Sequence, residues 1–408
     1  MIMQIKPILS ALRRHKSGTI LIALQIALTL AIVCNALFIV HERVDKVNRT
    51  TGLDETNLIA VSNDYVGAPE DFTPLMKTDL QTLRSLPGVV DAYVTNSYPL
   101  RQGGWSTGVQ TDPDSKAKGQ STALYFGDEH ALKTLGVRLI AGRNFNAGET
   151  VTVGRQQQPG TAQVIVTKAL ADKVFPDGNA LGKVIYLAKG KPSTIIGIVE
   201  KLTTPWIQND FVEGDYVTIM PVMFNSSFQQ FLVRTQPGQE DAVFKAIPPA
   251  LYATNRMRVL PDKVGIRKFE EVRRRAYDAD RGMAILMSVV CGVLLAITAA
   301  GIVGLSSFWV GQRRKQIGVR RALGARRSDI LSYFMTENFL IALVGVIVGV
   351  ILAVGLSQWM FTHFEMKRLS LTYVAIGVVA LLALGQAAVF APALRASRVS
   401  PVEATRSV

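Results

Sequence analysis

Residues 283–311 read MAILMSVVCGVLLAITAAGIVGLSSFWVG and contain no charged side chain. A helix needs roughly 20 apolar residues to cross the hydrocarbon core of a membrane, so this stretch predicts a transmembrane helix. Three other predominantly apolar stretches are long enough to do the same, namely residues 18–40, 330–356 and 371–391. The sequence therefore predicts an α-helical membrane domain of four transmembrane helices.

The first apolar stretch, residues 18–40, is predicted to be an uncleaved anchor and not a cleaved signal peptide. It is longer than a typical apolar signal core, and the residues that follow it, HERVDKV, contain no small-x-small cleavage site. The residues before it, 1–17, place apolar side chains at helical spacing beside lysines and arginines. We therefore expect an amphipathic N-terminal helix that lies on the membrane surface.

Lysine and arginine are concentrated in three segments that flank the apolar stretches, and this bias predicts the orientation of the chain. Because cytoplasmic loops carry an excess of these residues, we expect residues 1–17, the 312–329 loop and the 392–408 tail in the cytoplasm. Both termini are then cytoplasmic. The short 357–370 loop and the long 41–282 segment then lie across the membrane, in the periplasm of a Gram-negative cell or outside a Gram-positive one. We take the inner membrane and the periplasm as the expected location.

The 41–282 segment is predicted to be a large mixed α/β extracytoplasmic domain, inserted between transmembrane helices 1 and 2. Strand-like runs such as STIIGIV (193–199) alternate with helix-like runs, and Gly and Pro breaks separate them. The charged residues 263–282 are expected to extend the second transmembrane helix outward as a stalk, with a break at Gly282 as the alternative. The net charge of +14 is concentrated in the cytoplasmic segments, so nucleic acid is not an expected partner of this domain.

The sequence contains no constellation that points to catalysis or metal binding. The four histidines lack metal-ligand spacing, the two cysteines lie in apolar stretches, and no GxxxxGK[ST] phosphate-binding motif occurs. We therefore predict no catalytic residues, no metal, no cofactor bound by this chain and no enzymatic activity of its own. Gly345 and Gly349 form a G-x-x-x-G pair, which predicts the close approach of another helix.

The loop QRRKQIGVRRALGARRSDI (312–330) mixes basic residues with apolar ones. The positive-inside rule explains the charge, but it does not require side chains such as Ile317 and Leu323. Nucleic-acid binding is disfavoured because the loop is short and lacks aromatic residues. A docking surface for a cytoplasmic partner would use both the charged and the apolar side chains, and we favour this interpretation.

A short helix is predicted within this loop. Gly318 and Gly324 are expected to bracket the helix, and Ser328 or Asp329 is expected to cap the next one. Glu337 follows Asp329 by about two helical turns, which places it near the cytoplasmic headgroups as a possible interfacial acid. A contact with the loop arginines and simple solvation at the interface both remain open for this carboxylate.

The same loop resembles that of MacB/FtsX-like ABC transporter permeases, whose pattern is approximately E-R-x-x-E-I-G-[IV]-R-x-A-[LIM]-G-A. The chain matches this pattern at Arg313 and through IGVR and ALGA, and Glu337 matches an acidic residue of the helix that follows. It departs from the pattern at Gln312 and Gln316, where the family usually has Glu. Landmarks such as LRSLPGVVDA in the outer domain and PALRASRVSPVEATR near the C-terminus extend the resemblance over the whole chain.

The resemblance implies that the loop is a coupling element that rests on a separate cytoplasmic ABC ATPase subunit, which would bind ATP and Mg²⁺. The expected ATPase-coupling residues are Ile317, Gly318, Val319, Arg320, Ala322, Leu323, Gly324 and Ala325. A second permease protomer, identical or related, is implied as well. The outer domain would have two parts, one built from residues 41–105 and 225–262 and the other inserted between them.

The family further implies mechanotransmission, in which ATP-driven work in the cytoplasm is delivered to the periplasm. We expect efflux of drugs, peptides or other small molecules, together with a periplasmic adaptor and an outer-membrane channel. The alternatives are extraction of lipoproteins or lipids from the inner membrane, and a non-transport role in signalling or in activating a cell-wall hydrolase. Membrane lipids are the remaining expected partners of this multi-pass chain.

Overall fold

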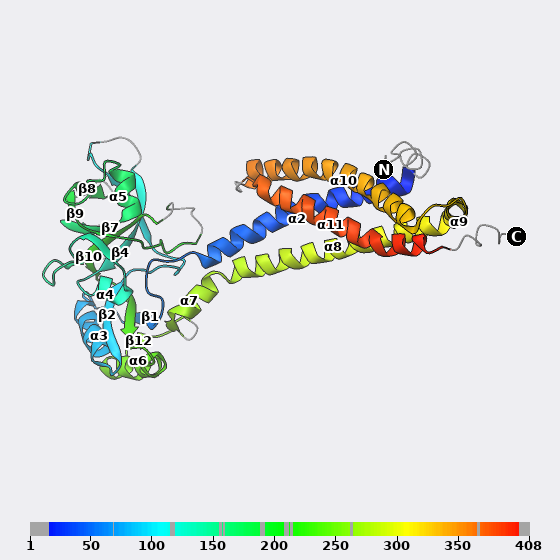
Figure 1. Ribbon diagram of the computed structural model, residues 1–408. Helices are drawn as coiled ribbons and strands as arrows, with labels where there is room; N and C mark the ends of the chain where they lie inside the picture. Colours follow the sequence, from blue (N-terminus) through cyan, green and yellow to red (C-terminus); the bar gives the residue numbers. More distant parts are fainter. Residues whose placement is uncertain are drawn as a thin grey trace. The chain divides into compact units, whose positions relative to one another are not determined.

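The computed structural model describes residues 16–399 apart from 68, 115–118, 155–156, 158–159, 188–191, 208–211, 213–214, 262–263 and 365–367. Most of the expected N-terminal amphipathic helix and the last residues of the tail lie outside the described residues. The chain divides into two compact units. The helical unit comprises residues 1–47 and 279–408, and the α/β unit comprises residues 48–278 (Figure 1).

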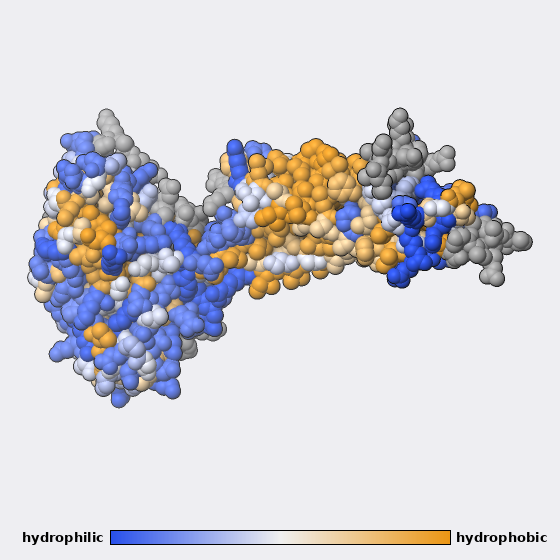
Figure 2. Space-filling view, viewed as in Figure 1, coloured by the Kyte–Doolittle hydropathy of each residue, from blue (hydrophilic) through white to orange (hydrophobic). Residues whose placement is uncertain are grey.

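The helical unit is built from long apolar helices. In chain order these are α2 (Lys16–Asn48), α8 (Asp278–Gln312), α10 (Arg327–Phe364) and α11 (Leu371–Ser397), with the short α9 (Arg314–Ala322) between α8 and α10. Within the described residues, the four long helices are sufficiently long and apolar to cross a membrane. Their surface forms a continuous hydrophobic band in Figure 2, which agrees with the predicted membrane domain.

The expected continuous stalk over residues 263–282 is wrong. Residues Ile266–Lys268 form strand β13, which pairs with strand β1 of the α/β unit, so this part of the segment is extended. Helix α7 (Phe269–Ala276) follows, and Tyr277, with φ −105° and ψ 9°, separates it from α8. Gly282 lies inside α8, so the helix is interrupted at Tyr277 and not at the glycine considered from the sequence.

The G-x-x-x-G pair of α10 packs against α2, as the sequence predicts. A Cβ atom on Gly345 would lie 2.7 Å from the carbonyl oxygen of Ala23, and one on Gly349 would lie 2.9 Å from that of Ala27. These distances leave no room for a side chain at either position. The two glycines therefore permit the backbone of α10 to approach that of α2, around the buried Ile26 of α2.

Polar side chains connect the helices inside the helical unit. The hydroxyl groups of Thr29 in α2 and Thr298 in α8 lie 2.7 Å apart. The Asn35 side chain donates a hydrogen bond to the carbonyl oxygen of Ala353 in α10, and Asn338 donates one to that of Gly385 in α11. Such bonds stabilise helix association because an apolar environment offers these groups no other partner.

One side of α8 carries large apolar side chains that the rest of the chain leaves exposed. Ile285, Val289 and Ile297 are 66%, 57% and 55% exposed, although they lie in the apolar part of the helix. By contrast, α2 has one exposed side, which includes Leu21 and Leu24, and one side on which Ile22, Ile26 and Leu30 are fully or almost fully buried. Helix α8 therefore presents an open apolar face within this chain.

The first part of the α/β unit is a sheet with the order β12-β1-β11-β2, and β13 also pairs with β1. The strands are β1 (Leu58–Tyr65), β2 (Val89–Thr95), β11 (Phe228–Thr235), β12 (Arg258–Val259) and β13 (Ile266–Lys268). Helices α3 (Thr73–Ser85) and α6 (Glu240–Thr254) contribute to the same hydrophobic core. Beside it, Asp79 of α3 forms two hydrogen bonds of 2.7 and 2.8 Å with the buried guanidinium of Arg258.

The second part is an eight-stranded sheet, among the described residues, with the order β4-β3-β8-β9-β7-β10-β6 and β5 beside β9. An extra pairing between β4 and β10 closes part of this sheet on itself. The strands are β3 (Trp105–Gln110), β4 (Gln120–Gly127), β5 (Leu139–Gly142), β6 (Val151–Val153), β7 (Gln163–Thr167), β8 (Val184–Leu187), β9 (Pro192–Val199) and β10 (Val217–Phe224). Helices α4 (Ala131–Leu135) and α5 (Lys168–Val174) complete this part.

The two sheets confirm the expected two-part organisation of the α/β unit. The strands of the second sheet all lie between residues 105 and 224, whereas β1 and β2 precede this range and β11, β12 and β13 follow it. The second part is therefore inserted into the first. Along the chain, the whole α/β unit lies between α2 and α8.

Candidate functional site

The predicted loop helix is α9, and its end is set by Gly324. The backbone N–H of Ala325 donates to the carbonyl oxygen of Arg320, and that of Gly324 donates to Arg321, both at 3.1 Å. Gly324 has φ +98°, a conformation that glycine adopts without strain. This pair of bonds is a Schellman motif, so the prediction for Gly324 is confirmed. Gly318, however, is buried inside α9, so the prediction that it brackets the helix is wrong.

The start of α10 is stabilised by Asp329. Its carboxylate accepts a hydrogen bond of 2.9 Å from the backbone N–H of Arg326, the residue just before the helix. Asp329 is the third residue of α10, so it acts from within the first turn and not from the capping position itself. A negative charge here also interacts favourably with the positive end of the helix dipole. Gly324 and Asp329 together set the short turn between α9 and α10.

Glu337 contacts a loop arginine. Of the two alternatives left open by the sequence, an arginine contact and simple solvation at the interface, the structure supports the first. Arg313 lies between α8 and α9, and its Nη1 donates hydrogen bonds of 3.0 and 2.8 Å to the two carboxylate oxygens of Glu337 in α10. The residues are 9% and 2% exposed, so this is a buried ion pair. Glu337 is therefore not a freely solvated acid. The pair attaches the start of α9 to α10.

Two further arginines attach the other end of α9. The Arg321 guanidinium donates hydrogen bonds of 3.2 and 2.9 Å to the carbonyl oxygens of Ser397 and Val399, at the end of α11. A cation at the end of a helix satisfies free carbonyl groups and complements the helix dipole. The Arg320 guanidinium lies 4.9 Å from the centre of the Tyr333 ring in α10. The helix is thus attached to both α10 and α11.

The expected coupling residues fall on two opposite sides of α9. Ile317 and Gly318 are buried, and Ile317 is only 4% exposed, so the Ile317 side chain and the Gly318 backbone face the inside of the helical unit. Val319 and Leu323 are 45% and 83% exposed, respectively. The remaining members of the set are exposed or half-buried: Arg320, Ala322, Gly324 and Ala325.

Around α9 the surface is strongly hydrophilic. Figure 2 shows blue side chains gathered at the end of the helical unit where Figure 1 places α9, next to the hydrophobic band. Exposed basic residues of this region include Arg314, Arg326 and Arg327. Leu323 is therefore a large apolar side chain among cations. Within the described part of the chain, no group of three or more His, Cys, Asp or Glu side chains is arranged to hold a metal ion.

The sequence left a contact between Glu337 and the loop arginines open without identifying Arg313, and it missed the anchoring role of Arg321, although a signal was present. Arg313, Ile317 and Arg321 follow one another at four-residue intervals, and side chains at this spacing share one face of a helix. Ile317 is the apolar residue among these three, and its presence indicates that this face of the helix is buried. The partners of the two arginines could not have been read from the loop, because they lie 24 and 76–78 residues away.

Two family models match the chain. The model of the MacB-like periplasmic core domain matches residues 19–250, and that of the FtsX-like permease C-terminal domain matches residues 288–401. The first match covers more than half of the chain. It includes α2 and most of the α/β unit, and the second match includes α9, α10 and α11.

Several curated proteins are similar to the chain. Macrolide export ATP-binding/permease protein MacB of Chromobacterium violaceum is 28% identical over 283 residues, which are 67% of this chain and 41% of that protein. The protein of the same name from Neisseria gonorrhoeae is 26% identical, over 77% of this chain and 47% of its own length. An uncharacterized ABC transporter permease of Bacillus subtilis, YvrN, is 26% identical over 69% of both chains. The chain thus spans less than half of the length of the two macrolide export proteins.

Solved structures of extracytoplasmic domains are also similar. The extracellular domain of the transporter YknZ from Gram-positive bacteria matches 51% of this chain and 98% of its own, with 15% identity and a TM-score of 0.32. The periplasmic region of MacB from Actinobacillus actinomycetemcomitans matches 56% of this chain and 97% of its own, with 14% identity and a TM-score of 0.32.

Proposed function

This chain belongs to the family of MacB-like ABC transporter permeases, and on that basis we propose that α9 is the element by which a separate cytoplasmic ATPase acts on it. In this proposal ATP and Mg²⁺ bind to the ATPase subunit, and the chain itself is not catalytic. Its four long helices cross the inner membrane with both termini in the cytoplasm. The α/β unit then lies in the periplasm, and a second permease protomer completes the assembly.

The observation that carries this proposal is the division of α9 into an anchored side and an exposed apolar side. Leu323 is 83% exposed at the end of a helix whose other side is fixed by the buried Ile317, by the Arg313–Glu337 ion pair and by the hydrogen bonds of Arg321. Complete burial of a leucine side chain contributes about 1.5–3 kcal/mol, so a partner that covers Leu323 gains stability from it. The surrounding arginines suit a partner with acidic groups beside an apolar pocket.

The anchored side suggests how movement would pass from the ATPase into the membrane. Because Arg313 is bonded to α10 and Arg321 to the end of α11, a displacement of α9 acts on both helices. In the chain, helix α8 directly follows Tyr277 and α7, and α7 belongs to the α/β unit. ATP-driven movement in the cytoplasm would in this way produce conformational work in the periplasm, without a polar channel through one protomer.

Efflux is the form of this work that we propose for the chain. Two of the similar curated proteins carry macrolide export in their names, and the chain matches the core domain model through residue 250. The cargo would be a drug, peptide or other small molecule taken from the periplasm. A periplasmic adaptor and an outer-membrane channel would carry it out of the cell.

The docking role of α9 is tested by placing a charge on its exposed side. We expect Leu323→Asp and Val319→Asp to leave the chain folded in the membrane and to abolish its co-purification with its ATPase subunit. Leu371→Asp is the matched control, because Leu371 is 76% exposed at the start of α11. Normal recovery of the ATPase with both α9 variants would refute the proposal.

One additional variant, Arg314→Gln, separates docking from a role of charge alone. Ile317→Asp is not suitable for testing docking, because a buried carboxylate at this position would disrupt the packing of α9. Arg314→Gln removes an exposed positive charge and leaves Leu323 in place. If the loop only holds the chain in its orientation, Arg314→Gln should impair insertion more than Leu323→Asp does.

A further inference from the structure

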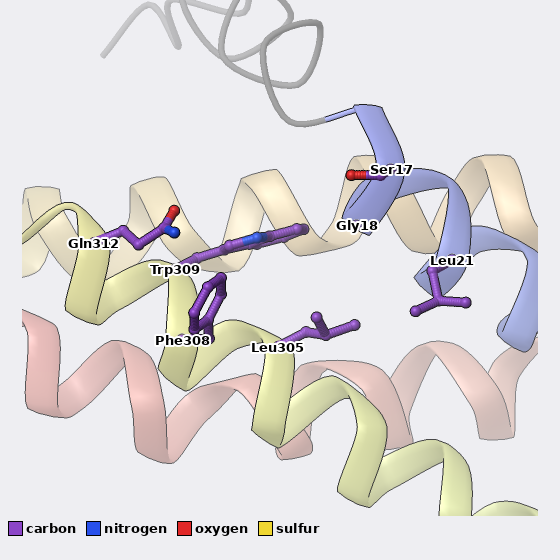
Figure 3. A pocket seen from close by; sticks show the side chains of 7 residues that line it. All are labelled: Ser17, Gly18, Leu21, Leu305, Phe308, Trp309 and Gln312. Atoms are coloured by element: carbon purple, nitrogen blue, oxygen red, sulfur yellow. The ribbon is translucent and has the colours of Figure 1, made fainter.

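A groove lies between the beginning of α2 and the end of α8, inside the helical unit (Figure 3). Its volume is about 380 Å³, within the range of about 300–1,000 Å³ that small-molecule sites have. Leu21 of α2 and Leu305 and Phe308 of α8 supply apolar walls. In Figure 3 the Trp309 ring extends from α8 toward Gly18 of α2, along the groove.

The position of the Trp309 ring depends on Gly18. A Cβ atom on Gly18 would lie 2.8 Å from the Cζ2 atom of the indole, so any other residue would displace the ring. Trp309 is only 8% exposed, and its indole nitrogen forms no hydrogen bond with the described residues. The indole N–H is a donor only, so it can donate a hydrogen bond to a ligand or to water in the groove.

Two other polar side chains line the same groove without a partner. Neither the hydroxyl group of Ser17 nor the amide of Gln312 forms a hydrogen bond with another described residue. Together with the Trp309 nitrogen, they provide three donors beside the apolar walls. Basic residues stand next to them in the chain, since Lys16 precedes Ser17 and Arg314 follows Gln312 by two positions, and both are exposed.

This combination of groups is suited to one kind of ligand. Phosphate oxygens accept hydrogen bonds from uncharged donors and attract Lys and Arg, whereas an acyl chain packs against leucine and phenylalanine. Phe308 and Leu21 are 59% and 55% exposed on helices that are apolar enough to cross a membrane, so acyl chains can reach them. Tryptophan is also enriched at the level of the headgroups.

We propose that this groove binds one anionic phospholipid, with its phosphate at Ser17, Trp309 and Gln312 and the start of an acyl chain against Leu21 and Phe308. Lys16 and Arg314 favour an anionic headgroup over a zwitterionic one. The bound lipid connects the start of α2 to the end of α8, just before Arg313 and α9. The site thus lies beside the coupling element but does not depend on any role of α9.

Trp309 itself can report on the occupant of the groove. A full-length variant with Trp105, Trp206 and Trp359 changed to Phe has Trp309 as its single tryptophan. It is placed in phosphatidylcholine bilayers with increasing fractions of dibrominated phosphatidylglycerol or dibrominated phosphatidylcholine, which quench tryptophan on contact. We expect half-maximal quenching at about a fivefold lower fraction of the anionic lipid. The matched control keeps Trp359, which is 51% exposed on α10, and should show no preference.

Three double variants distinguish a built site from general attraction of anionic lipid to a basic protein. Lys16→Gln with Arg314→Gln should remove the preference, whereas Arg326→Gln with Arg327→Gln, which removes the same charge elsewhere, should preserve it. Ser17→Ala with Gln312→Ala leaves the charge unchanged and should weaken the preference severalfold. Equal quenching by both lipids, no quenching by either, or a preference that survives Ser17→Ala with Gln312→Ala would overturn the proposal.

Discussion

Removal of one member of the Arg313–Glu337 pair should destabilise the helical unit strongly. The side chains are 11% and 3% exposed, and Nη1 of Arg313 contacts both oxygens of Glu337. Loss of one partner leaves the other charge buried, which costs about 3–5 kcal/mol in comparable pairs. Because Arg313 retains some exposure, we expect Glu337→Met to cost about 3 kcal/mol.

The magnitude is tested by a double-mutant cycle in mixed micelles. Arg313→Met, Glu337→Met and the double variant are unfolded with sodium dodecyl sulfate, and helix content is followed by circular dichroism. We expect each single variant to lose about 3 kcal/mol and the double variant to recover most of this loss, since it leaves no unpaired charge. Arg314→Met, at an exposed position, should change stability by no more than about 0.5 kcal/mol. Additive losses in the double variant would refute the reasoning.

Three other predictions follow from individual contacts. Gly349→Val should destabilise the helical unit by about 1–3 kcal/mol in the same unfolding assay, since its Cβ would meet the α2 backbone at 2.9 Å. Asp79→Asn should cost the α/β unit about 3–5 kcal/mol in urea unfolding, because it leaves the Arg258 charge buried, and an unchanged midpoint would contradict this. Hydrogen bonds from Arg143 and from a backbone N–H lower the pKa of Glu149 from 4.5 to about 2. Its contribution to stability is therefore fully present above pH 4.5 and lost as the pH falls through about 2, and Arg143→Gln should raise this pKa in a carboxyl NMR titration.

The membrane helices could be predicted because their signal is local. A stretch without charge, such as residues 283–311, is sufficient to indicate a long apolar helix. The stalk could not be predicted in the same way. Residues Ile266–Lys268 are compatible with a helix, but their pairing with Ile59–Val61 of β1 makes them a strand. That pairing joins residues about 200 positions apart and is not encoded in the segment itself.

The two glycines of the loop show the same limit at the candidate site. The sequence alone does not distinguish a glycine that ends a helix from one that is buried inside it. The prediction of a helix boundary was therefore correct at Gly324 and wrong at Gly318. The alternation of charged and apolar residues suggested a docking surface, but it could not tell which apolar residues are accessible. That distinction depends on the contacts of α9 with α10 and α11, which place Ile317 inside and Leu323 outside.

The open apolar face of α8 has a different meaning in a bilayer than it would have in water. In water, side chains such as Ile285, Val289 and Ile297 would drive association through the release of ordered solvent. Lipid tails are as apolar as these side chains, so that driving force is absent. A protein that contacts this face must compete with lipid through closer packing. The strength of such an association therefore depends on the thickness and composition of the membrane. The association can be reversible even when the contact area is large.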